Sequence, residues 1–162
     1  MFDFGSIQFE HNAFIDSLTD ADAQTIFFDN LVKAVSNRKR SGGALLILTL
    51  EIIAPKKGFK KGGIAAKRQI SDYEESLKRA ARIINKNLRR EDSFTRMAVN
   101  GFYILIRGEK KEEQLTIERF KKLFADRATY KIEAHPLVGD LTATQWLNQI
   151  DMNYFRESSN VD

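Results

Sequence analysis

The fold of this chain depends on the stretch RMAVNGFYILIRG, residues 96–108. Its Asn100-Gly101 dipeptide is typical of a tight β-hairpin turn, because both central positions of such a turn favour residues that tolerate a positive φ. An apolar run, Phe102 to Ile106, follows directly. The pattern predicts an antiparallel hairpin. Its tip has no acid, histidine or hydroxyl, although tight turns at the end of a sheet often hold functional residues.

The composition is that of an ordinary globular protein. The chain has 162 residues, of which 43% are hydrophobic and 30% charged, with a net charge of +4. This length favours one domain with a real core. There is no cysteine and there are only two histidines, so we expect neither disulfides nor a metal site. No apolar run approaches the roughly 18 residues of a membrane span, and the N-terminus lacks the features of a signal peptide. We therefore expect no membrane insertion and a cytoplasmic location.

The hydrophobic pattern predicts the order helix, strand, helix, hairpin, helix, strand, helix. Thr19 is expected to cap the first helix, a Ser71–Glu74 capping box the second, and Thr142 with Gln145 the last. Three helices are expected at about 20–38, 71–88 and 112–125, and a fourth begins near 142. Besides the hairpin, strands are expected at 44–53 and about 129–136. The expected inward residues of the later helices are Leu77, Ala80, Ala81, Ile84, Leu88, Leu115, Phe120, Leu123, Phe124, Trp146, Leu147 and Ile150.

These elements predict an α+β fold of the ferredoxin-like or polymerase-palm type, in which helices pack on a single sheet with a central antiparallel hairpin. Residues 44–53 are nearly all apolar, as in a strand buried on both faces, and Pro136 ends the last strand or places it at an edge. We divide the chain into a leader, 1–13, a domain, 14–158, and a tail, 159–162. The leader's Phe2, Phe4, Ile7 and Phe9 are expected to pack on the domain or on a partner.

DSLTDADAQTIFFDNL, 16–31, is similar to the D-x-L-T-G-L-x-N-R-x-x-F pattern that opens the diguanylate cyclase (GGDEF) domain family, and the chain resembles that family from Asp16 to Arg156. LLILTLEI, 45–52, stands where the family has a core strand ending in D-x-D. REDSFTRMAVNGFYILI, 90–106, replaces the segment through R-x-G-G-D-E-F, and WLNQIDMNYFRE, 146–157, is similar to the closing helix. The resemblance covers about nine-tenths of the chain and implies the same fold.

The resemblance also implies that catalysis has been lost. In the family, the signature turn and a strand-end acid hold Mg²⁺ and the triphosphate of GTP, and Mg²⁺ requires hard anionic oxygens. Here a hydroxyl and an amide replace two of those acids, and Glu51 keeps only the neighbouring acidic place. We expect no enzyme activity, no catalytic residue, no metal and no cofactor. Glu74 either contacts guanine, as a family acid does, or is only a favourable charge near a helix start. The degenerate positions are Thr49, Glu51, Ala98, Val99, Asn100 and Gly101.

A second family motif is retained. The family's product-binding inhibitory site is R-x-x-D, and its spacing from the signature places it at Arg89 and Asp92, in the sequence RRED. Arginine presents a planar fork to guanine O6 and N7 and can also bind phosphate, and aspartate can accept from a guanine N–H. Alternatively, Arg89 complements a helix C-terminus and pairs with Asp92 in solvent. A second basic group should complete the site, with Arg82 and Lys86 as candidates.

The segment APKKGFKKGGIAAKRQ, 54–69, reads as a long basic loop. It could contact phosphate or nucleic acid, but lysine-rich loops are more often solvated surface. Phe59 within it either anchors the loop or stacks on a base. We do not expect nucleic acid to be a partner, and any binding should be weak and non-specific.

The sequence thus predicts a catalytically inactive GGDEF-like domain. The leading hypothesis is a receptor for cyclic di-GMP, a bacterial second messenger, which relays the signal to a signalling or effector protein. The alternative is a protein-interaction module without nucleotide binding, and a third reading is a residual GTP-binding enzyme. The identity of the partner and the oligomeric state, including a homodimer, stay open.

Overall fold

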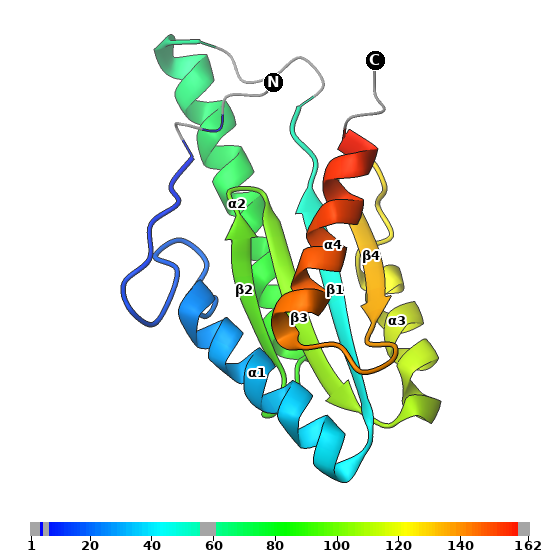
Figure 1. Cartoon of the computed structure of the whole chain (residues 1–162). Coiled ribbons are helices and arrows are strands. Elements are labelled where there is room, and N and C mark those ends of the chain that lie inside the picture. The colour runs from blue at the N-terminus through cyan, green and yellow to red at the C-terminus, as the bar shows by residue number, and fades with distance from the viewer. Residues whose placement is uncertain (1–3, 5–6, 56–60, 159–162) are drawn as a thin grey trace.

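The structure is a computed structural model that describes residue 4, residues 7–55 and residues 61–158, with side chains up to position 151. The predicted order of elements is confirmed (Figure 1). The elements are α1 (Gln24–Ser41), β1 (Ala44–Ile52), α2 (Gly63–Asn87), β2 (Ser93–Ala98), β3 (Gly101–Gly108), α3 (Lys110–Leu123), β4 (Tyr130–Pro136) and α4 (Ala143–Ser158).

The strands form one sheet in the order β2-β3-β1-β4, with every neighbouring pair antiparallel. α1 and α4 cover one face of this sheet, and α2 and α3 cover the other (Figure 1). The predicted α+β fold is therefore confirmed. β4 is an edge strand, where the missing N–H of Pro136 leaves no ladder position unfilled.

The strand β1 supplies side chains to both layers of the core. Leu46, Leu48, Leu50 and Ile52 lie in the cluster with α2 and α3, and the alternating Leu45 and Ile47 lie in the cluster with α1 and α4. Residues on a strand alternate between its faces, so an apolar side chain is needed at nearly every position. This explains the unbroken apolar run at 44–48.

The helix α1 starts later than expected, at Gln24, with Ala23 at its N-cap. The Thr19 cap is therefore wrong. Thr19 instead donates from its N–H and its hydroxyl to Asp16 Oδ2, at 2.9 and 2.6 Å. The Asp22 N–H donates to Phe94 O on β2 at 3.0 Å. These bonds to a turn and to a distant strand hold the backbone out of the helix.

The helix α2 starts earlier than expected, at Gly63. The Ser71–Glu74 capping box is wrong because both residues lie inside this helix. Lys67 and Arg68, predicted in a basic loop, lie on the first turns of α2. Residues 56–60 of that loop, including Phe59, lie outside the described residues.

The hairpin is confirmed, but its turn differs from the prediction. Ala98 pairs with Gly101, so the tip is Val99-Asn100. Among the described non-glycine residues only Asp20 has a positive φ, and Gly101 is not among the described glycines that do. A register shift between Arg96 and Ala98 accompanies the turn, and such bulges bend and twist a strand. The bulge therefore replaces the left-handed backbone expected of an Asn-Gly turn.

The later helices follow the prediction with two exceptions. Leu115 and Leu123 were expected in the core, but they are 68% and 38% exposed. The buried side of α3 is formed by Ile117, Phe120 and Phe124, whose three- and four-residue spacing places them on one face. α4 is capped as predicted: the Thr142 N–H donates to Gln145 Oε1 at 2.9 Å, and the Gln145 N–H donates to Thr142 Oγ1 at 3.2 Å.

Among the described residues, none of the helices combines the length and the apolar character needed to cross a lipid bilayer.

Candidate functional site

The degenerate signature positions meet at the hairpin end of β1. Glu51 lies opposite Gly101 across the β1–β3 ladder, and Asn100 Nδ2 donates to Glu51 Oε1 at 3.3 Å. Thr49 is buried and its hydroxyl hydrogen-bonds His135 Nε2 at 3.0 Å. The described residues include no cluster of three His, Asp or Glu side chains placed to hold a metal. The Mg²⁺ that the resemblance implies for catalysis does not fit this set of one carboxylate, one amide and one hydroxyl.

A second buried polar contact lies on the same face of the sheet. The Tyr103 hydroxyl donates to Asp151 on α4, and Tyr103 is directly opposite Thr49 in the ladder. Burial, with the neighbouring Asp151 carboxylate, raises the pKa of Tyr103. The contact joins α4 to the sheet, and no sequence motif marks either Tyr103 or His135. Only the alternation along β3 could have placed Tyr103 on this face.

Arg96 on β2 is completely buried. Its Nε and Nη2 donate to Val99 O at 2.9 and 2.7 Å, and its Nη1 lies 3.3 Å from Asp16 Oδ1. Asp16 is itself 3% exposed. The carbonyl at the hairpin tip and the carboxylate of the opening motif are therefore joined by one guanidinium, which forms charge-assisted hydrogen bonds in the protein interior.

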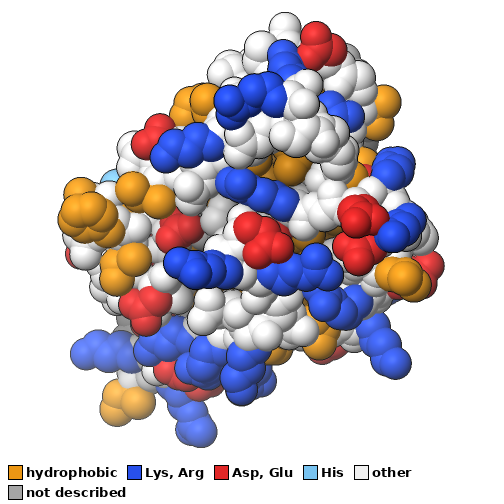
Figure 2. Space-filling model, turned by 90° about the horizontal axis from the view of Figure 1, so that it is seen from below, with side chains coloured by type: hydrophobic (Ala, Val, Ile, Leu, Met, Phe, Trp, Pro, Cys, Tyr) orange, Lys and Arg blue, Asp and Glu red, His pale blue; other side chains and the backbone are white. Residues whose placement is uncertain are grey.

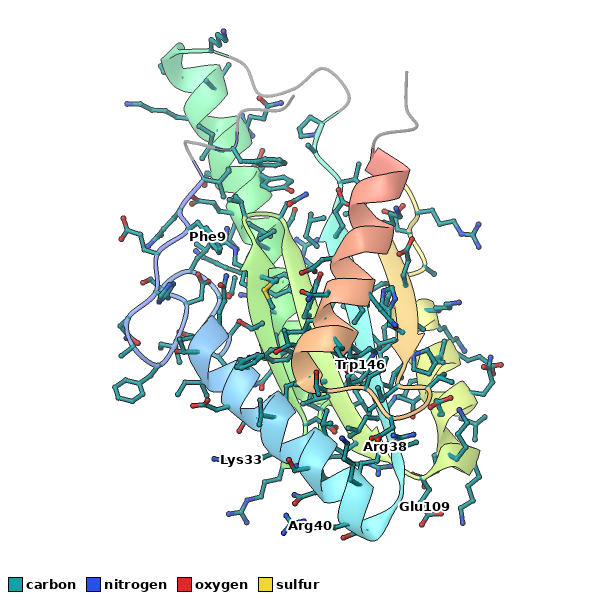
Figure 3. The ribbon with its side chains drawn as sticks, viewed as in Figure 1. Phe9, Lys33, Arg38, Arg40, Glu109 and Trp146 are labelled. Carbon is teal, nitrogen blue, oxygen red and sulfur yellow. The ribbon has the colours of Figure 1, made fainter. Side chains whose placement is uncertain are left out.

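The leader packs against this arginine. Gln8 O accepts from Arg96 Nη1 at 2.6 Å, and the Gln8 N–H donates to Glu74 Oε1 at 3.0 Å. The prediction that the leader packs on the domain is confirmed for its described aromatic and aliphatic residues, and Phe2 lies outside the described residues. The packed side chains are Phe4 against Tyr73, Ile7 in the core, and Phe9, whose ring centroid is 4.9 Å from Arg96 Cζ. Figure 3 labels Phe9.

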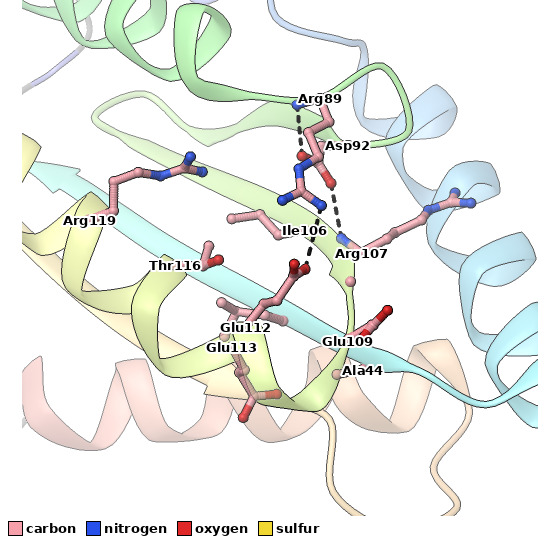
Figure 4. A pocket seen from close by; sticks show the side chains of 12 residues that line it. Ala44, Arg89, Asp92, Ile106, Arg107, Glu109, Glu112, Glu113, Thr116 and Arg119 are labelled. Carbon is pink, nitrogen blue, oxygen red and sulfur yellow. Dashed lines mark hydrogen bonds and ion pairs between the residues drawn. The ribbon is translucent and has the colours of Figure 1, made fainter.

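The RRED turn lies at the opposite end of the sheet, between α2 and β2. Asp92 is fixed by the backbone: Oδ2 accepts from the Arg89 N–H at 2.8 Å, and Oδ1 accepts from the Arg107 N–H at 3.0 Å (Figure 4). Burial raises the pKa of Asp92, and the two backbone hydrogen bonds oppose that effect. Each carboxylate oxygen can accept more than one hydrogen bond, so Asp92 keeps capacity for a further donor.

The side chain of Arg89 passes beside Asp92 and reaches Glu112 on α3. It is 55% exposed, and its Nη1 lies 3.6 Å from Glu112 Oε2 (Figure 4). The sequence alternative, an ion pair between Arg89 and Asp92 in solvent, does not form among the described side chains, because Glu112 takes that place. The structure thus presents a fixed carboxylate acceptor and an accessible guanidinium beside each other.

These residues line a shallow hollow, here called the RRED hollow, which opens to solvent and has a cavity volume of only about 20 Å³. Arg119 on α3 lines it together with Arg89, whereas Arg82 and Lys86, the candidates from sequence, do not. Arg107 also lines it, but its guanidinium turns towards α1, where Nη2 donates to Asn30 O at 3.2 Å (Figure 4). Arg119 is therefore the better second basic group.

The electrostatic surroundings of the RRED hollow are mixed. Acidic and basic side chains alternate over this end of the molecule (Figure 2). The hollow is lined by three arginines and by four acids, Asp92, Glu109, Glu112 and Glu113. An anionic ligand would therefore have to compete with carboxylates for the guanidinium of Arg89.

No protein-family profile and no curated protein sequence matches the chain. Solved structures do match its fold. The GGDEF domain of DgcB from Caulobacter crescentus in complex with cyclic di-GMP has a TM-score of 0.72 at 14% identity, over 96% of this chain and 93% of that one. A microbial GGDEF domain described in a novel interaction mode with cyclic di-GMP has a TM-score of 0.70 at 16% identity, over 91% and 92% of the two chains.

The diguanylate cyclase SiaD from Pseudomonas aeruginosa, solved in complex with its activator SiaC, has a TM-score of 0.70 at 16% identity; the match covers 90% of this chain and 58% of that one. The chain therefore has the fold of GGDEF domains, and the resemblance seen in the sequence is confirmed at the level of fold.

Proposed function

We propose that this chain is a catalytically inactive GGDEF-fold domain that binds cyclic di-GMP at Arg89 and Asp92, with Arg119 as the second basic group, and relays binding to a partner protein. The observation that carries the proposal is the geometry of the RRED turn. Asp92 is held in place by two backbone N–H groups, while the Arg89 guanidinium is accessible at the rim of the hollow.

The chemistry of these groups suits a guanine nucleotide. The fork of Arg89 can donate to guanine O6 and N7, which are both acceptors. Adenine offers an amino group in place of O6, so the same fork discriminates against it. Arg119 lines the same hollow and can bind a phosphate oxygen pair. GGDEF-fold neighbours solved with cyclic di-GMP support the choice of ligand.

The Arg89–Glu112 ion pair favours the alternative, a protein-interaction module without nucleotide binding, because it occupies the guanidinium. Both side chains are about half exposed and the charged atoms are 3.6 Å apart. Exposed pairs of this kind contribute only about 0.2–1 kcal/mol. A bidentate guanine contact is worth about 1–3 kcal/mol in discrimination between bases, so the exposed ion pair is a weak competitor for the guanidinium.

The proposal of inactivity rests on the hairpin end of the sheet. Thr49 and Asn100 present a hydroxyl and an amide, and both are engaged with protein side chains. Phosphoryl transfer depends on charge neutralisation by Mg²⁺, for which this set of side chains is unsuited.

Calorimetry with cyclic di-GMP and cyclic di-AMP tests the binding function. We expect the folded protein to bind the guanine dinucleotide selectively, and Arg89→Ala to weaken binding by about 5- to 150-fold, the equivalent of one bidentate guanine contact. Glu112→Gln should tighten binding, because it releases the Arg89 guanidinium and removes a negative charge.

The matched control is Arg90→Ala, which removes an exposed arginine one residue away that does not line the RRED hollow. It should bind as the parent protein does. Absence of heat at tens of micromolar cyclic di-GMP, or equal binding by Arg89→Ala and Arg90→Ala, would contradict the receptor function and leave the interaction module in its place.

A further inference from the structure

A second and larger hollow, here called the α3–β4 hollow, lies at the other end of the sheet. It is lined by Ile53 just past β1, the C-terminal end of α3, the connection to β4 and the start of β4, and it has a cavity volume of about 580 Å³. Ala44, at one end of β1, lines the RRED hollow, and Ile53, just past the other end, lines this one. Nine residue steps of strand separate them by about 30 Å, so the two sites are distinct.

The rim of this hollow is positive. Lys121, Arg127 and Lys131 line it, and no acidic residue does. Lys131 lies 3.4 Å from Glu133, but Lys121 and Arg127 have no acidic partner within the described part of the chain. The RRED hollow differs in charge, because four acids line it together with three arginines. An anion meets less competition here.

The floor of the hollow is apolar and partly aromatic. The rings of Phe124 and Tyr130 pack edge to face with centroids 5.0 Å apart. Phe124 is 1% exposed, whereas Tyr130 is only partly buried. Ile53 and Ile132 complete the apolar lining. A flat aromatic ring of a ligand, such as a nucleobase, can stack on such a surface.

The connection that presents Arg127 is already rigid. The Asp126 carboxylate accepts from the Ala128 N–H at 3.0 Å and from the Thr129 hydroxyl at 2.7 Å. The Asp126 carbonyl accepts from the Tyr130 N–H at 2.8 Å, and the Ile53 N–H donates to Thr129 O at 2.8 Å. The Asp126 carboxylate is thus engaged within the turn. A ligand that binds at the rim loses little conformational entropy by ordering this connection.

We infer that the α3–β4 hollow binds a mononucleotide, with its phosphate on Lys121 and Arg127 and its base against Tyr130. Its cavity volume of about 580 Å³ is within the range of about 300–1,000 Å³ for small-molecule pockets. An acidic peptide would use the rim charges alone and leave the aromatic floor unused. Base stacking is tolerant of sequence because every base has a π-face, so GMP and AMP should bind similarly, unlike the guanine selectivity at the RRED hollow.

The test is a titration of the full chain, followed by amide chemical shifts in NMR, with GMP, AMP, inorganic phosphate and a single-stranded oligonucleotide as separate probes. We expect GMP and AMP to shift the amides of residues 121–132 with similar affinity, and inorganic phosphate to bind about tenfold more weakly because it has no ring to stack. Arg127→Glu should weaken GMP binding at least tenfold, and the milder Lys121→Gln should weaken it less.

The matched control is Lys33→Glu, the same charge reversal at an exposed lysine that points away from the domain on α1 (Figure 3), which should leave GMP binding unchanged. The inference is overturned if GMP causes no shifts, if Arg127→Glu and Lys33→Glu bind alike, or if a glutamate-rich peptide competes as well as AMP does. Shifts with the oligonucleotide but not with GMP would identify a nucleic-acid surface instead. Binding of cyclic di-GMP at Arg89 should be unaffected by Arg127→Glu, so this site and the proposed receptor function fail independently.

Discussion

Arg96 is expected to be the charged side chain whose loss destabilises this domain most. Its side chain is 0% exposed, and it donates to Val99 O and to Gln8 O while its Nη1 lies 3.3 Å from Asp16 Oδ1. Replacement by Met keeps much of the volume but removes every donor. Two carbonyls then lose their partner, and the Asp16 carboxylate, whose side chain is 4% exposed, loses its counter-charge.

Breaking a buried ion pair by removing one partner costs about 3–5 kcal/mol. We therefore expect Arg96→Met to lower the free energy of unfolding by about this amount. For a domain of roughly 150–250 residues, each kcal/mol corresponds to about 2–4 °C in Tm, so Tm should fall by about 6–20 °C. Urea unfolding followed by far-UV circular dichroism measures the free energy, and a thermal scan measures Tm.

Two further variants separate the ion pair from general disruption. Arg90→Met removes an exposed arginine and should change stability by no more than about 0.5 kcal/mol. Asp16→Asn keeps an acceptor for Thr19 but removes the charge, so adding it to Arg96→Met should cost less than the sum of the single changes, with a coupling of about 0.5–3 kcal/mol. A loss below about 1 kcal/mol for Arg96→Met, or strict additivity in the double variant, would refute this account of a buried charge held by one partner.

The remaining predictions concern catalysis and titration. Incubation with GTP and Mg²⁺ or Mn²⁺ should yield no cyclic dinucleotide by chromatography. Acids introduced at Thr49 and Asn100 should not restore synthesis, because Ala98 and Val99 remain. Steady product that disappears in Glu51→Ala would contradict this prediction. Carboxyl-carbon NMR should find the pKa of Asp126 below its ordinary value of 3.8, chiefly because the Thr129 hydroxyl donates to it, and the pKa of Asp92 above 3.8, chiefly because of burial. Ionised Asp126 therefore stabilises the fold at a pH above its unfolded pKa, and this stability is lost as the pH falls through its folded pKa. Ionised Asp92 destabilises the fold, and this cost disappears as the pH falls through the folded pKa of Asp92. Thr129→Val should raise the pKa of Asp126 and leave the pKa of Asp92 unchanged, and an unchanged Asp126 pKa would show that the hydroxyl is not the cause.

Local sequence signals were sufficient for much of the fold. The pairing of β2 with β3 as a hairpin, the capping box at Thr142 and the edge position of Pro136 are as predicted, although the hairpin turn lies one residue earlier than expected. Each depends on neighbours within a few residues: a turn, a cap, or a ring that cannot donate. The apolar periodicity of α2 is equally local, and Leu77, Ala80, Ala81 and Ile84 are buried as expected.

Local signals failed where a distant segment competed for the same groups. Thr19 has the side chain of a helix cap, but Asp16 takes its N–H and hydroxyl, and β2 takes the N–H of Asp22. Leu115 and Leu123 are apolar, but only the packing of α3 on the sheet decides which of its faces is covered. Apolar composition limits which faces can be buried; the docking angle of the helix selects one.

For the candidate site, the sequence alone identified Arg89 and Asp92 as a pair of residues three apart near a helix end, and it identified the missing acids at Thr49 and Asn100. It could not show that Arg107 fixes Asp92, that Glu112 holds Arg89, or that Arg119 rather than Arg82 shares the hollow. Those partners are 15 or more residues away along the chain and come close only when α3 and β3 pack beside the end of α2. Residue types and short spacings are properties of the chain itself, whereas the position of one side chain relative to another on a different element is decided by how the helices pack on the sheet.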